Sequence, residues 1–125
     1  MGVFRYRVEI AAVEAGPFVP VETLVDAGAA YTWIPSDVLA GLGVAPRDRR
    51  RFVVADRRLI ERDVGIVVMR LDGKVQPTVC IFGDVGSEPL LGAVTLEEFA
   101  LAPDPVHRRL VPVPVLYLLK TGTRR

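Results

Sequence analysis

Short runs of alternating apolar and polar residues, each ended by a turn signal, recur along the chain and constrain its fold more than any other feature. The first run, VFRYRVEI (3–10), places its apolar side chains on one face and its charged side chains on the other. This period-2 pattern is typical of a half-buried strand. Between two later runs, the Asp72-Gly73 pair predicts a tight hairpin. Because no run alternates with a long helical segment, the pattern predicts an all-β sandwich or closed barrel.

The other runs extend this interpretation to most of the chain. Strands are expected at 18–25, 30–35, 51–55, 58–71, 74–82 and 108–119, and short helices at 36–43 and 93–100. Ser36 is the expected N-cap of the first helix, and Gly43 follows its end. APDP (102–105) predicts a turn, and Pro112 and Pro114 predict that the last strand is irregular or at an edge.

Composition indicates one soluble globular domain. The chain has 125 residues, an apolar share of 50% and a formal net charge of +1, so we expect a single domain over 1–119 with a loose tail at 120–125. This charge gives no reason to expect nucleic acid or a membrane as a partner. No apolar run approaches the roughly 18 residues of a membrane span, and the N-terminus alternates where a signal peptide would be continuously apolar. The expected location is the cytoplasm.

The chemistry of cysteine and histidine is sparse. Cys80 is the single cysteine and lies among apolar neighbours, so we expect a buried thiol and no internal disulfide. His107 is the single histidine, without a second histidine or a cysteine nearby. A metal site or a Ser/His nucleophile pair is therefore not expected, and no cofactor is predicted.

Three Asp-x-Gly triplets occur, at Asp26, Asp63 and Asp84. Asp63 lies in a charged stretch and Asp84 in a polar glycine-rich loop, so both are expected to be solvated. Asp26 differs because the apolar run VETLV precedes it and the small residues AGAA follow it. Taken alone, this acid is best explained as an ordinary Asx-turn residue that bonds the backbone at Gly28 or beyond, because Asp-x-Gly is a common turn triplet. A carboxylate removed from water otherwise needs a partner charge, hydrogen-bond donors or a shared proton.

The wider pattern around Asp26 resembles the retropepsin-like aspartic proteases. VETLVDAGAAYTWIP, a short helix, a charged hairpin and then EPLLGAVTLEEFALAPDP follow one another in the order found in that family. The resemblance extends from about Phe4 to Val113. It implies the closed acid-protease lobe with two short helices, an endopeptidase activity and a homodimer.

The resemblance also assigns residues to roles. It implies Asp26 as the catalytic aspartate, within an active-site loop that includes Ala27, Gly28 and Ala29. It further implies a supporting loop, Leu90, Leu91 and Gly92, packed beneath the active-site loop. The segment FVVADRRLIER would be the flap that covers a bound peptide, with its tip at Val54, Ala55, Asp56, Arg57, Arg58 and Leu59.

Two positions depart from the family pattern. Ala27 stands where the family has Thr or Ser, whose hydroxyl bonds across the two-fold axis. The expected flap tip lacks the usual glycine, and its charges are either solvated turn residues or arginines that favour acidic substrates. Trp33 is expected to be a core residue in preference to a substrate contact.

Peptide hydrolysis by this route needs two carboxylates around one water, whereas the chain offers one suitable acid. A C2 dimer would supply the second, because a two-fold axis beside Asp26 brings both copies together. The leading hypothesis is therefore a homodimeric aspartic endopeptidase acting on peptides or unfolded protein segments. A non-catalytic peptide-binding module with the same fold, and a monomeric β-domain used only for assembly, are the alternatives; Ala27 favours the first of them.

Overall fold

The computed structural model describes residues 3–114. Nine strands and two short helices follow one another in this part of the chain. They are β1 (Phe4–Ala11), β2 (Val19–Val25), β3 (Thr32–Pro35), α1 (Ser36–Leu42), β4 (Asp48–Val53), β5 (Leu59–Leu71), β6 (Lys74–Gly83), β7 (Leu90–Leu91), α2 (Ala93–Glu98), β8 (Leu101–Asp104) and β9 (Arg109–Pro112). No helix among them is long and apolar enough to cross a membrane. The tail expected at 120–125 lies outside the described residues.

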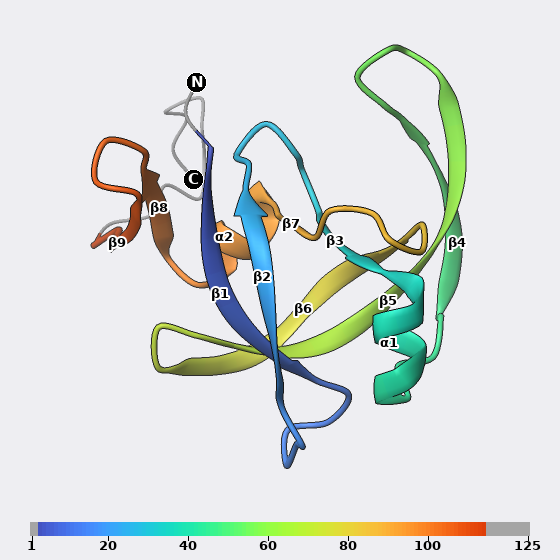
Figure 1. Cartoon of the computed structure of the whole chain (residues 1–125), viewed down its shortest axis with the longest axis horizontal. Helices are drawn as coiled ribbons and strands as arrows, with labels where there is room; N and C mark the ends of the chain where they lie inside the picture. Colours follow the sequence, from blue (N-terminus) through green and yellow to red (C-terminus); the bar gives the residue numbers. More distant parts are fainter. Residues whose placement is uncertain (1–2, 115–125) are drawn as a thin grey trace, which may run out of the picture.

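Seven strands form one sheet in the order β1-β2-β7-β3-β6-β5-β4. The sheet closes because β1 also pairs with β5, where Ile10 lies opposite Met69. The closed strands form a barrel, and β4 is left at an edge, paired only with the first half of β5. The β4–β5 hairpin consequently projects from the barrel, at the upper right of Figure 1. The predicted all-β closed barrel is confirmed.

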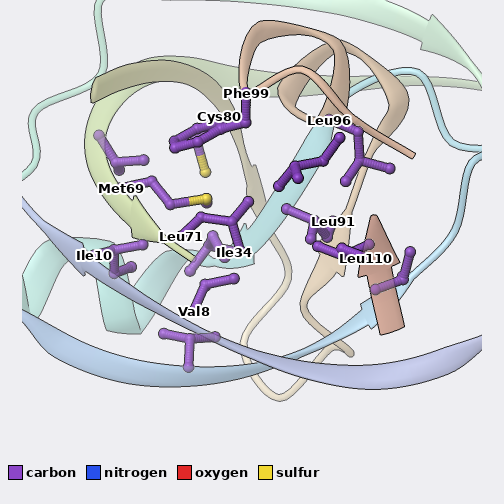
Figure 2. Packing of buried hydrophobic residues seen from close by; sticks show 14 of the residues in the cluster. Val8, Ile10, Ile34, Met69, Leu71, Cys80, Leu91, Leu96, Phe99 and Leu110 are labelled. Carbon is purple, nitrogen blue, oxygen red and sulfur yellow. The ribbon is translucent and has the colours of Figure 1, made fainter. Parts of the chain in front are cut away.

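The interior of the barrel is an apolar core to which most strands contribute. Val8 and Ile10 from β1, Met69 and Leu71 from β5, and Leu91 from β7 are each at most 1% exposed, and Figure 2 shows them gathered in one cluster. Burying side chains of this size stabilises a fold by about 1.5–3 kcal/mol each. The apolar residues of the alternating pattern therefore form the core of the barrel.

Turn chemistry explains the connections that the sequence predicted. The backbone φ angles of Asp72 and Gly73 are 50° and 81°, which the tight turn between β5 and β6 requires. Gly43, with φ 83°, ends α1 in the left-handed conformation. Ser36, however, is not the N-cap: Pro35 holds that position in extended conformation, so Ser36 is already the first helical residue.

The prediction of a turn at 102–105 is largely wrong. Residues Leu101–Asp104 form strand β8, which pairs antiparallel with β9 in a separate two-stranded sheet. Pro103 and Pro112 are compatible with these strands because a two-stranded sheet has only edge strands. There, a proline without an N–H group need not remove a hydrogen bond between strands. β9 ends at Pro112, and the rest of the strand expected at 108–119 lies mostly beyond the described residues.

Candidate active site

The Asp26 carboxylate lies at the start of the turn that joins β2 to β3. Asp26 is half-buried, whereas Ala27 and Gly28 are exposed at the apex of the turn. The Gly28 amide donates a hydrogen bond of 2.9 Å to Asp26 Oδ1, as an Asx-turn would have it. Within residues 3–114, Oδ2 makes no hydrogen bond, so this oxygen remains available to a proton, a water or a second carboxylate.

The segment 91–94, at the end of β7 and the start of α2, holds this turn from below. Three backbone hydrogen bonds join the two: Asp26 N to Leu91 O (3.1 Å), Ala93 N to Ala29 O (2.8 Å) and Val94 N to Ala30 O (2.9 Å). The two amides from α2 belong to its first turn, where N–H groups have no partner inside the helix. The helix start thus supplies donors to the turn that carries Asp26.

Gly92 lets these two segments approach closely. A Cβ atom at this position would lie 2.4 Å from the carbonyl carbon of Tyr31 and 2.5 Å from its oxygen. Backbone atoms cannot yield as a side chain can, so the contact excludes every other residue. The structure therefore places Leu91 and Gly92 directly against the turn, and pairs Leu90 with Leu24, two residues before Asp26.

The β4–β5 hairpin tip is an ordered turn. Val54 N donates to Arg58 O at 3.0 Å, and Arg57 N donates to Val54 O at 2.8 Å. Arg57 has φ 71°, the left-handed conformation for which glycine is the usual choice. The Arg58 guanidinium bonds Asp56 at 2.7 Å and holds the pKa of that carboxyl below its ordinary value. Apart from Val54, the predicted tip residues are exposed in the single chain.

An aromatic cluster joins the hairpin to the strand that follows the turn. The Phe52 ring of β4 lies 5.9 Å from the Trp33 ring and 6.3 Å from the Tyr31 ring, measured between centroids. The expectation that Trp33 belongs to the core does not hold for the main core. Its neighbours in β3, Thr32 and Ile34, take the core-facing positions, and Trp33 lies half-buried on the opposite side of the sheet.

Strand register extends this second face toward Asp26. Trp33 lies beside Ile81 of β6 and opposite Leu90 of β7, and Ile81 lies opposite Val64 of β5. Partners in register point to the same side of a sheet. A continuous apolar face therefore runs from β7, next to the Asp26 turn, across β3 and β6 to the hairpin.

The other two Asp-x-Gly acids are surface groups. The Asp63 side chain is 37% exposed and bonds Arg49, and the Asp84 side chain is 72% exposed and bonds Arg62. The expectation that both are solvated is confirmed, and neither lies in the turn that carries Asp26.

Cys80 offers no nucleophile. Its side chain is fully buried in the barrel, and burial raises the pKa of the thiol to about 12. Among residues 3–114, no group of three or more histidine, cysteine or acidic side chains is placed to hold a metal ion. The chemistry of the described site therefore depends on its carboxylate.

Sequence reasoning missed three buried threonines behind the turn, Thr32, Thr78 and Thr95. They lie in β3, β6 and α2 and bond one another through their hydroxyls. A polar residue at a core-facing position of an otherwise apolar strand was the available signal, since such a group needs a partner.

No protein-family model matches the sequence, and no curated protein matches it at a significant level. Solved structures do share its fold. The Simian Foamy Virus (mac) protease superposes with a TM-score of 0.56 at 15% identity, covering 80% of this chain and 99% of its own. The EIAV protease in complex with the inhibitor HBY-793 superposes with a TM-score of 0.54 at 19% identity, covering 76% of this chain and 86% of its own. A retropepsin-like aspartic protease from Rickettsia conorii superposes with a TM-score of 0.52 at 17% identity, covering 82% of this chain and 87% of its own. The chain thus has the retropepsin-like fold.

Proposed function

We propose that this protein is a homodimeric aspartic endopeptidase in which Asp26 of each chain contributes one of the two catalytic carboxylates. The observation that carries the proposal is the placement of Asp26: its carboxylate stands beside an exposed turn, with Oδ1 bonded to Gly28, in a fold shared with known aspartic proteases. The backbone bonds from 91–94 hold the turn, and with it the position of this carboxylate.

The need for a dimer follows from the chemistry. General-base activation of a water and protonation of the scissile carbonyl require one ionised and one protonated carboxyl group. The exposed apex at Ala27 and Gly28 is open enough for a two-fold axis to pass beside it. Two carboxylates that meet there cannot both ionise easily, so they share one proton across the axis.

The substrate would lie between the Asp26 turn and the β4–β5 hairpin. An extended peptide presents side chains alternately to opposite sides, and the apolar face that includes Trp33, Phe52 and Leu90 would receive those on one side. The hairpin then acts as the flap that covers the peptide, and peptides or unfolded protein segments are the substrate class.

A second candidate, a peptide-binding module with weak or no turnover, is favoured by Ala27. The family resemblance implies a hydroxyl at this position that bonds across the axis. Its absence removes a symmetric pair of bonds of about 0.5–1.5 kcal/mol each, and catalysis is sensitive to small misplacements. In this alternative the groove remains and the carboxylates are poorly aligned.

Incubation with a diverse peptide mixture from mildly acidic to neutral pH, with and without a pepstatin-like inhibitor, tests the proposal. The wild-type protein should cleave peptides, and Asp26→Asn should abolish cleavage because an amide cannot serve as the base. Asp63→Asn is the matched control, since it changes an acid in the same triplet outside the turn. Cleavage by Asp26→Asn would refute the proposal. Peptide binding by the wild type without cleavage would replace it with the binding module.

A further inference from the structure

A line of buried hydroxyl groups runs through the protein behind the Asp26 turn. Thr32 and Thr95 are fully buried and Thr78 is 2% exposed. The Oγ1 atoms of Thr32 and Thr95 are 2.6 Å apart, and those of Thr95 and Thr78 are 2.8 Å apart. Hydroxyls buried in this way need hydrogen-bond partners, and these three find them in one another.

The line has a defined group at each end. At the inner end, the Gly92 amide donates to Thr32 Oγ1 at 3.1 Å. At the outer end, Thr78 Oγ1 donates to Glu98 Oε1 at 2.7 Å, and Glu98 lies exposed at the end of α2. The line therefore connects the segment beneath the active-site turn to a carboxylate on the surface.

Counting protons fixes the direction of every bond. An ionised carboxylate only accepts, and each threonine hydroxyl has one proton to donate. Thr78 gives its proton to Glu98, so it must accept from Thr95, and Thr95 in turn must accept from Thr32. Thr32 accepts from Gly92, which completes a single chain of donors that all point toward Glu98. Bonds aligned in this way polarise and strengthen one another.

We propose that Thr32, Thr95, Thr78 and Glu98 form a hydroxyl relay that positions the Asp26 turn, with the Glu98 carboxylate setting its polarity. The relay holds the Gly92 amide, and the residues on either side of Gly92 hold the turn: Leu91 O accepts from Asp26, and Ala93 N donates to Ala29. The four relay members are positioning residues. Their effect on cleavage rests on the proposed function, whereas their effect on the segment 91–94 does not.

A purely structural role for these hydroxyls predicts something different. If they only satisfied their own bonding needs, removing the exposed acid at one end would leave the other end unchanged, since Thr78 would turn its proton elsewhere. In the relay, loss of the Glu98 carboxylate removes the acceptor that fixes the direction of the hydrogen bonds between the threonines. The bond from Gly92 to Thr32 then weakens, although neither residue has been changed.

The first experiment compares Glu98→Leu with Glu97→Leu by amide hydrogen exchange. Glu97 is the adjacent exposed acid of α2, and its side chain makes no hydrogen bond within the described residues. Glu98→Leu should speed exchange at Gly92 by about tenfold or more and abolish the slowly exchanging hydroxyl proton signal of Thr78. Glu97→Leu should do neither. Equal exchange at Gly92 in the two variants overturns the relay, whatever the peptidase activity.

The second experiment removes a hydroxyl from the middle of the relay. Thr95→Val keeps the shape and loses the bond, whereas Thr95→Ser keeps the hydroxyl. With a cleaved peptide as substrate, Thr95→Val should lower kcat by about tenfold or more with a smaller change in KM, because misplaced catalytic groups act on the chemical step. Thr95→Ser should restore it. Equal kcat in the valine and serine variants overturns the positioning role.

These outcomes separate the inference from the proposed function. If the wild-type protein cleaves nothing, the exchange comparison at Gly92 still decides whether the relay exists. If Thr95→Val does not fold, Glu98→Leu, which changes only an exposed side chain, still decides it. A normal Gly92 exchange rate in Glu98→Leu, with active wild-type enzyme, overturns the relay and leaves the peptidase intact.

Discussion

Replacing Gly92 with alanine should break the support of the Asp26 turn. The added Cβ would lie 2.4 Å and 2.5 Å from the carbonyl carbon and oxygen of Tyr31, and 2.9 Å from the Thr32 nitrogen. Ordinary contact between carbon atoms needs about 3.5 Å or more, so the two segments must separate by roughly 1 Å. All three contacts are backbone atoms, which leaves no side chain to rotate away.

The expected loss of stability has two parts. Overpacking of this kind costs about 1–3 kcal/mol. Separation also weakens the bonds from Gly92 N to Thr32 and from Ala93 N to Ala29, each of which contributes about 0.5–1.5 kcal/mol. We therefore expect the free energy of unfolding to fall by about 2–6 kcal/mol, a large part of the 5–15 kcal/mol typical of a domain.

Gly41→Ala is the matched control. Gly41 lies in α1, and a Cβ atom there would meet nothing within 4 Å. The same substitution should raise stability by about 0.5–1 kcal/mol, because alanine loses less backbone freedom in a helix. Urea unfolding at equal protein concentration measures both, with a midpoint lower by about 2 M for Gly92→Ala. A Gly92→Ala midpoint equal to that of the wild type would refute the close approach described here.

Three further outcomes are expected. If the protein forms the proposed dimer, Ala27→Thr should tighten it by roughly one to two powers of ten by adding the cross-axis bonds that the family resemblance implies, and a dilution series that shows no tightening would contradict this. Burial and the 2.7 Å bond to Asp72 raise the pKa of Tyr6 from 10.0 to about 12. An unfolded chain releases this proton first, so the free energy of unfolding should decrease as pH rises through this window, and Tyr6→Phe should flatten the decrease measured by urea titration. Phe52→Ala should shift the emission of Trp33, the single tryptophan, to longer wavelength as its 5.9 Å ring contact is lost, at a cost of about 1 kcal/mol; unchanged fluorescence would count against the aromatic cluster.

Local patterns predicted most of the strands, because the alternation and the turns that identify a strand depend on residues that are neighbours in the sequence. Alternation identified β1, and Asp72-Gly73 identified the β5–β6 hairpin through its need for positive φ angles. Ser36 failed as an N-cap because Pro35, one residue earlier, keeps the extended conformation of β3. Strand β8 was missed because its pairing with β9, and not its proline-rich sequence, makes it a strand.

The sequence predicted only part of the site, because the other contacts join residues that are far apart in the chain. Asp26 stood out because an apolar run and a small-residue turn surround it in the sequence. Thr32 and Thr95 are 63 positions apart, and no local pattern predicts that their hydroxyl groups form a hydrogen bond. Likewise, the packing of Phe52 on Trp33 joins residues of β4 and β3, which are not neighbours in the sheet. Such contacts are tertiary, so a single sequence does not encode them at any fixed spacing.

Subunit mixing with Asp26→Asn tests the central claim most directly, because it asks whether each catalytic site needs Asp26 from two chains. Wild-type and Asp26→Asn protein are mixed in varying proportion at constant total concentration, exchanged by dissociation and reassociation, and assayed for peptide cleavage. A dyad shared between chains predicts activity that follows the square of the wild-type fraction, since a mixed dimer has only one carboxylate. Activity that falls in direct proportion to the wild-type fraction would show that one chain suffices and would contradict the shared dyad.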